Sequence, residues 1–110
     1  MITVVLTLGA SDELVAIKAS GHAGKGKLGS DPVCAAVSFL LRTIALYLDG
    51  ACSVKAETRG AFSLSVNACD VVALQADLQV LARFAQRGLN SLIAENPSNV
   101  KLTVEQLTTL

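Results

Sequence analysis

Residues 20–38 read Ser-Gly-His-Ala-Gly-Lys-Gly-Lys-Leu-Gly-Ser-Asp-Pro-Val-Cys-Ala-Ala-Val-Ser and run from the end of a predicted hairpin into a predicted helix. This stretch holds the only histidine of the chain, His22. Three glycines follow the histidine at short intervals, at Gly24, Gly26 and Gly29. Because glycine has more backbone freedom than any other residue, this spacing predicts a flexible loop.

The loop leads into a well-marked helix start. Asp31 is a favoured N-cap residue and Pro32 a favoured first helical residue, so we expect a helix from here to about Asp49. Gly50 is a natural stop signal at its end. The helix surface is apolar nearly all round, which predicts that both of its sides are covered. Its polar exceptions recur every four residues and therefore stack along one face, at Cys34, Ser38 and Arg42.

Upstream of the loop, the sequence predicts two strands joined as a hairpin. Residues 2–8 alternate between apolar and polar side chains, which is the pattern of a half-buried strand. Residues 9–13 form a turn, and residues 14–20 form the partner strand. In that second strand the inward-facing residues are expected to be Val15, Ile17 and Ala19.

Downstream of the helix, residues 52–57 and 61–67 predict a second hairpin. Its buried face is expected to carry Cys52, Val54 and Ala56. Asp70 is placed to cap a second helix over about 71–95, whose apolar residues keep helical spacing. Gly88 interrupts this helix and suggests a close approach to a neighbouring element, or a kink.

A last strand begins at Val100, so the predicted order of elements is ββαββαβ. We therefore expect one α+β domain over residues 1–110, with two helices packed on a mostly antiparallel sheet. Apolar residues make up 52% of the 110 residues, which is high for a small chain and favours an oligomer that buries further surface. The formal net charge of zero predicts neither a nucleic-acid partner nor a membrane partner.

The three cysteines, Cys34, Cys52 and Cys69, contain no Cys-x-x-Cys pair, and the alternating N-terminus does not resemble a signal peptide. Thiols without a secretory signal are typical of a reducing cytoplasm. One histidine and three scattered cysteines make a zinc site improbable, so neither a metal nor another cofactor is expected.

Cys34 and His22 are the residues with the best potential for catalysis. Cys34 lies in the first helical turn, where backbone N–H groups and the positive end of the helix dipole favour a thiolate. The loop is long enough to bring His22 to this thiol as its base. The same N–H groups suit an oxyanion, unless the Asp31 carboxylate accepts from them. Asp31 has the alternative of turning toward His22 and orienting its ring.

Simpler interpretations apply to the same residues. A cysteine in an apolar helix is usually a small core residue, and a single histidine after a strand is usually an ordinary polar surface residue. Residues 21–27 fit the Gly-x4-Gly-Lys part of a P-loop, but Leu28 stands where Ser or Thr must hold magnesium. Ser38 and Arg42 are expected to be solvated, and Cys52 and Cys69 to be inert.

The blocks Ser-Gly-His-Ala-Gly (20–24) and Asp-Pro-Val-Cys-Ala-Ala-Val-Ser (31–38) resemble the ribosomal-processing cysteine protease family, Prp. The resemblance extends along the chain, through the ββαββαβ order to the segment Gly-Leu-x-x-Leu-Ile-Ala (88–94). Pro32 departs from the family pattern, which commonly has an aliphatic residue there.

This resemblance implies a cytoplasmic, homodimeric cysteine endopeptidase. The implied substrate is the N-terminal extension of the bacterial large-subunit ribosomal protein numbered twenty-seven. The motifs carry the nucleophile onto Cys34 and the general base onto His22, and they also match Asp31 and Ser38. Gly24, Gly26 and Gly29 would then belong to a gate loop that orders over the bound peptide.

Two other functions compete with proteolysis. One is a non-enzymatic ribosome-assembly or peptide-binding module that binds its partner in a groove at the same place, with Cys34 as an ordinary thiol. The other is a redox-sensing thiol, for which Cys52 or Cys69 of a partner chain would supply the second sulfur.

Overall fold

The computed structural model describes residues 1–21, 31–56 and 60–107. Within these residues the strands are β1 (Ile2–Leu8), β2 (Leu14–Ser20), β3 (Cys52–Lys55), β4 (Ala61–Val66) and β5 (Val100–Gln106). The helices are α1 (Pro32–Tyr47), α2 (Ala68–Ala73) and α3 (Gln75–Glu95). Both predicted hairpins, the first helix and the last strand are therefore present.

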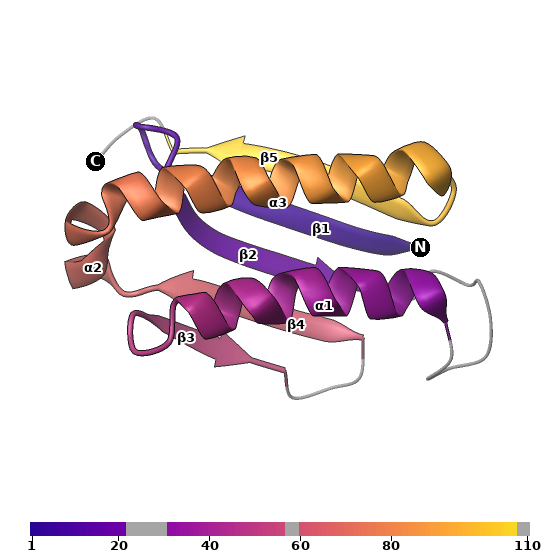
Figure 1. Cartoon of the computed structure of the whole chain (residues 1–110), viewed down its shortest axis with the longest axis horizontal. Helices are drawn as coiled ribbons and strands as arrows, with labels where there is room; N and C mark the ends of the chain where they lie inside the picture. Colours follow the sequence, from indigo (N-terminus) through magenta and orange to yellow (C-terminus); the bar gives the residue numbers. More distant parts are fainter. Residues whose placement is uncertain (22–30, 57–59, 108–110) are drawn as a thin grey trace.

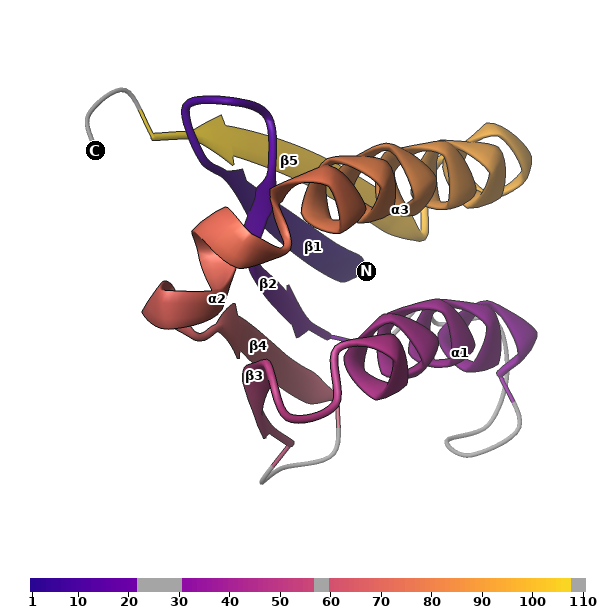
Figure 2. The same ribbon diagram turned by 60° about the vertical axis from the view of Figure 1, so that its left-hand side comes forward.

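The strands form one sheet in the order β3-β4-β2-β1-β5. All neighbours pair antiparallel except β1 and β5, which run parallel at one edge. Helices α1 and α3 lie side by side over one face of this sheet (Figures 1 and 2). The predicted α+β class, with helices on a mostly antiparallel sheet, is thus confirmed.

The core lies between the sheet and these two helices. Alternate residues of β1 are fully or nearly buried, as the period-two pattern predicts: Ile2, Val4, Leu6 and Leu8. The residues of α1 that meet them recur at helical spacing: Val33, Val37, Leu41 and Ile44. On α3 the corresponding residues are Leu78, Ala82, Ala85 and Leu89.

Helices α1 and α3 come close together at Gly88, as its position in the sequence suggests. A Cβ at Gly88 would lie 3.2 Å from Leu40 Cδ2 and 3.4 Å from Leu40 Cδ1. Since such distances are tight for a methyl group, glycine allows the two helices to pack at this separation.

The prediction of a single second helix over 71–95 is wrong in its first part. The chain becomes helical at Ala68 and changes direction at Leu74, so that α2 and α3 are separate helices, three in all among the described residues. Asp70 is not the N-cap, because it lies inside α2, where its carbonyl accepts from the Leu74 N–H. Asn67 occupies the cap position without a side-chain hydrogen bond.

The expected burial of β3 is also wrong in part. Cys52 is half-buried, but Val54 is 45% exposed and Ala56 is exposed. The reason is position, because β3 is an edge strand and pairs only with β4. No helix among the described residues is long and apolar enough to span a membrane.

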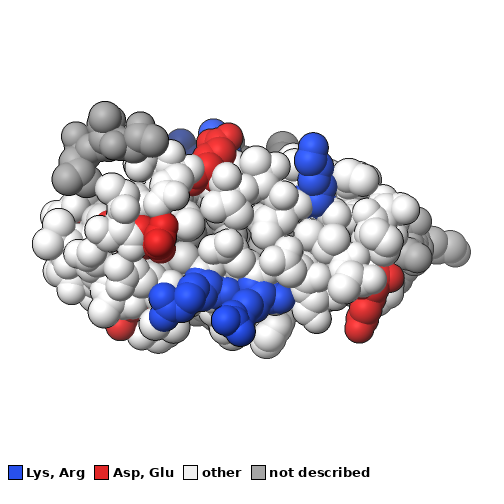
Figure 3. Space-filling view, turned by 90° about the horizontal axis from the view of Figure 1, so that it is seen from above, with Lys and Arg blue, Asp and Glu red and all other residues white. Residues whose placement is uncertain are grey.

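Within one chain, helix α1 is covered by the sheet and by α3 but not on its outer side, so the expectation that both sides are covered is not met by this chain alone. On the outer side three large apolar residues are exposed, namely Phe39 by 74%, Leu46 by 76% and Tyr47 by 62%. On α3 the side chains of Val80 and Phe84 are also more than half exposed. Figure 3, which looks onto the α3 and β5 edge, shows charged groups scattered singly or in pairs on a mostly uncharged surface.

Candidate active site

The start of α1 is held by Asp31, which is 6% exposed. Its Oδ1 accepts from the Val33 N–H at 2.8 Å and from the Cys34 N–H at 3.2 Å. The backbone of Asp31 is extended, as an N-cap requires, and Pro32 follows at the first helical position. Asp31 thus fills the role of the cap, while His22, toward which it has the alternative of turning, lies outside the described residues.

Cys34 is half-buried in the first turn of α1 and packs against the edge of the core. The N–H groups of this turn are already in use, because Val33 and Cys34 donate to Asp31 Oδ1 and Ala35 donates to Asp31 O at 3.0 Å. Pro32 has none to donate. With Asp31 as the cap, the N–H groups of the first turn are therefore not available to an oxyanion, which is the second of the two outcomes that the sequence leaves open.

The second element of the candidate site is the strand β2. It runs toward the end of the molecule at which α1 begins (Figure 1). Its last residue, Ser20, pairs with Thr3 of β1 and Ala61 of β4. The end of β2 is thus fixed on both sides by neighbouring strands. The position of Ser20, two residues before His22, follows from ordinary sheet pairing.

Gly21 is a structural requirement that the sequence reasoning missed. Its φ of +97° lies in the region that side chains with a Cβ rarely adopt. Its N–H donates to Gly60 O at 2.9 Å. A Cβ on Gly21 would collide with the carbonyl oxygen of Met1. The available signal was its place as the first glycine of the Gly-His-Ala block, at the exit of a strand.

Several predicted site residues lie outside the described part of the chain. They are His22 and the loop glycines Gly24, Gly26 and Gly29. Ser38 is described, and it is exposed one turn beyond Cys34 on α1. The structure therefore positions the proposed nucleophile and the two residues that flank the proposed base segment, Gly21 and Asp31.

The other two thiols have different surroundings. None of the three cysteines, all of which are described, forms a disulfide. Burial, and secondarily the negative charge of Asp49, raises the pKa of the Cys52 thiol, whose Sγ donates to Ala45 O at 3.9 Å. Cys69 is exposed on α2. Among the described residues no three His, Cys, Asp or Glu side chains gather in a way that would hold a metal ion.

The family model described as cysteine protease Prp matches residues 1–101 of the chain. Among solved structures, the ribosomal processing protease Prp of S. aureus with a covalently linked product peptide is 22% identical, with a TM-score of 0.80. That alignment covers 96% of this chain and 100% of the other. The same S. aureus protease with a substrate peptide is 21% identical, with a TM-score of 0.75, over 96% and 100% of the two chains.

A further similar structure is the protein SMU.848 of Streptococcus mutans. It is 25% identical, with a TM-score of 0.76, over 97% of this chain and 96% of the other. No curated protein matches the chain. The S. aureus structures share the fold along nearly the whole chain, and the family follows from the model match.

Proposed function

Since this chain belongs to the Prp family of cysteine proteases, we propose that Cys34 is its nucleophile and His22 its general base. The chain is thus an enzyme, and the alternative of a non-enzymatic module is set aside. The observation that carries the assignment is the position of Cys34, half-buried in the first turn of α1, at the end of the molecule to which β2 leads.

The proposed reaction proceeds in two steps. His22 accepts the proton of the Cys34 thiol, and the thiolate sulfur forms a bond to the carbonyl carbon of the scissile peptide. The C–N bond then breaks, and the departing amine takes the proton from His22. This leaves a thioester on Cys34. Water activated by His22 hydrolyses the thioester and restores the thiol.

The proposed substrate is the N-terminal extension of the bacterial large-subunit ribosomal protein numbered twenty-seven. Two observations support a peptide substrate of this kind. The family is one of cysteine proteases, and the similar S. aureus protein is a ribosomal processing protease solved with substrate and product peptides. We place the reaction in the cytoplasm, where three cysteines without a disulfide stay reduced.

Asp31 acts in this proposal as a positioning residue. By accepting from the Val33 and Cys34 N–H groups, it fixes the turn that carries the nucleophile. While it does so, the oxyanion of the tetrahedral intermediate must take its donors from elsewhere. Ser38 is the second supporting residue, one turn along the same face of α1 and open to solvent. Gly24, Gly26 and Gly29 form the proposed gate loop.

We also propose that the protein is a homodimer, in which two copies associate through the outer side of α1. Phe39 and Leu46 are seven residues apart and lie almost in line along the helix, with Tyr47 beside them. The hydroxyl of Thr43, between them, donates to Phe39 O at 2.6 Å and so does not need water. A helix face of this kind suits burial against a second copy.

Cleavage of a synthetic peptide that spans the extension and its junction tests the catalytic assignment. We expect Cys34→Ala and His22→Ala each to reduce kcat/KM at least a hundredfold, because each removes a group that takes part in bond making. Cys69→Ala, which removes an exposed thiol elsewhere, is the matched control and should keep full activity. Cleavage that persists in both site variants would refute the assignment.

A further inference from the structure

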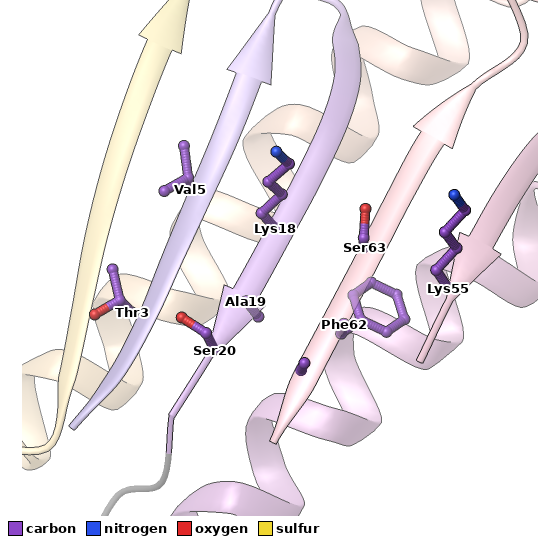
Figure 4. A pocket seen from close by; sticks show the side chains of 9 residues that line it. Thr3, Val5, Lys18, Ala19, Ser20, Lys55, Phe62 and Ser63 are labelled. Carbon is purple, nitrogen blue, oxygen red and sulfur yellow. The ribbon is translucent and has the colours of Figure 1, made fainter. Parts of the chain in front are cut away.

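The sheet has a second face, on which none of the described helices lies. Helices α1 and α3 occupy the opposite side (Figures 1 and 2). We call this second side the open face, and it bears Thr3 and Val5 of β1 and Lys18 of β2. A shallow pocket of about 430 Å³ lies on it, lined by strands β1 to β4 (Figure 4).

Two lysines border this pocket on either side of Ser63. Lys18 pairs with Ser63 across β2 and β4, and Ser63 pairs with Lys55 across β4 and β3. Neighbouring strands lie about 4.8 Å apart, so the two lysines are separated by roughly 10 Å. Figure 4 shows their side chains extending in the same direction, with the Ser63 hydroxyl between them.

Among the described residues, no acidic side chain balances the positive charge of these lysines. The side chains of Lys18 and Lys55 make no ion pair or hydrogen bond within that part of the chain. The described pocket lining contains no carboxylate. A third lysine, Lys101, pairs with Thr3 and so lies on the same face at the β5 edge. The acidic residue on that face of β5 is Glu105, four residues further along the strand.

The three lysines therefore lie on every second strand across the sheet, on β3, β2 and β5, over a width of about 19 Å. Lys55 and Lys18 are level with each other through Ser63, while Lys101 is level with Ser20, two residues along β2 from Lys18. Regularly repeated negative charge along a flexible chain complements this arrangement better than one compact anion does. Hydroxyl groups of Thr3, Ser20 and Ser63 lie between the lysines as hydrogen-bond donors for phosphate oxygens.

We propose that the open face binds the phosphodiester backbone of a single-stranded nucleic acid. Phe62 lines the pocket, but its side chain is half-buried and packs against the core, so the described lining offers no fully exposed ring on which bases could stack. Binding is therefore weak and independent of sequence. The zero net charge predicts no nucleic-acid partner, but it averages over the whole chain and conceals this local excess. The proposal is independent of the proteolytic function.

Fluorescence anisotropy with a labelled oligouridylate of about twelve nucleotides tests the proposal. Three phosphate contacts predict a slope of about −2 for log K against log salt. The double variant Lys18→Glu and Lys55→Glu should weaken binding at least tenfold. The matched control is Arg83→Glu and Arg87→Glu, which makes the same change in net charge on exposed positions of α3 and should cost less than threefold.

Equal losses in the two double variants would overturn the proposal, because binding would then follow net charge alone. Competition by a poly-glutamate peptide at equal charge concentration would also overturn it, since the face would then select carboxylates as readily as phosphates. Thermal unfolding and peptide cleavage, measured on the same samples, should be unchanged in the lysine variant. A change in unfolding would be checked with Lys18→Ala and Lys55→Ala, for which a threefold or greater loss of binding is still expected.

Discussion

At the scale of single residues, Gly21 determines how the chain leaves the sheet toward the proposed site. It combines a positive φ, a hydrogen bond to Gly60 and a contact with Met1 that leaves no room for a Cβ. His22 is the next residue in the chain. The direction in which the proposed base segment leaves the sheet therefore depends on a glycine that has no chemistry of its own.

Gly21→Ala should reduce peptide cleavage at least tenfold and lower the free energy of unfolding by more than Gly50→Ala does. Gly50 has a φ of +83° but nothing within 4 Å of its Cβ position, so it reports the conformational cost alone. That cost is about 1–2 kcal/mol for a residue with a Cβ. Urea unfolding of both variants measures the difference. Equal destabilisation would show that the contact with Met1 is unimportant.

At the scale of elements, the packing of α1 on α3 is set by Gly88 and Leu40. Alanine in place of glycine within a helix is worth about 1 kcal/mol in propensity. Here the added methyl group presses on the flexible end of the Leu40 side chain, 3.2 Å away. The two effects oppose each other, and the helix separation decides their balance.

In the natural background, Gly88→Ala should raise the free energy of unfolding by less than the gain that helix propensity alone would give, because the methyl group presses on Leu40. In a Leu40→Ala background, where the obstructing atoms are absent, the same substitution should recover the full gain of about 1 kcal/mol. Urea unfolding of the four proteins in this cycle gives the coupling. An identical effect of Gly88→Ala in both backgrounds would mean that the two helices do not meet there.

The elements also show what local sequence rules are able to predict. Period-two alternation located β1, and the Asp-Pro pair located the start of α1, because each pattern reports a property of its own segment. The break at Leu74 carries no proline or glycine signal, so continuous apolar spacing concealed it. The exposure of Val54 depends on β3 being an edge strand, which is a property of the sheet and not of the segment.

At the scale of the whole molecule, the chain leaves apolar surface on its helical layer. Phe39, Leu46 and Tyr47 of α1 point away from the core that the helix helps to form. The composition predicts that both sides of this helix are covered, and within one chain the side that bears these three residues is exposed. The sequence thus indicates how much apolar surface the helix has, while the division between core and exposed side chains depends on the packing of the sheet and of α3 against α1.

Sedimentation analysis should find the natural protein as a dimer. Phe39→Glu together with Leu46→Glu should give monomers, because two buried carboxylates per subunit would have to be desolvated. Val72→Glu is the matched control, since Val72 is 80% exposed on α2, and it should remain dimeric. A natural protein that is monomeric throughout the measured concentrations would contradict the proposed interface.

The alkylation rate of Cys34 by iodoacetamide, followed residue by residue with mass spectrometry, tests the pairing of Cys34 with His22 most directly. Below neutral pH we expect Cys34 to react faster than the exposed Cys69, and Cys52 to react slowest because burial raises its pKa. His22→Ala should lower the Cys34 rate at least tenfold and leave Cys69 unchanged. A Cys34 rate equal to that of Cys69 and insensitive to His22→Ala would contradict the account.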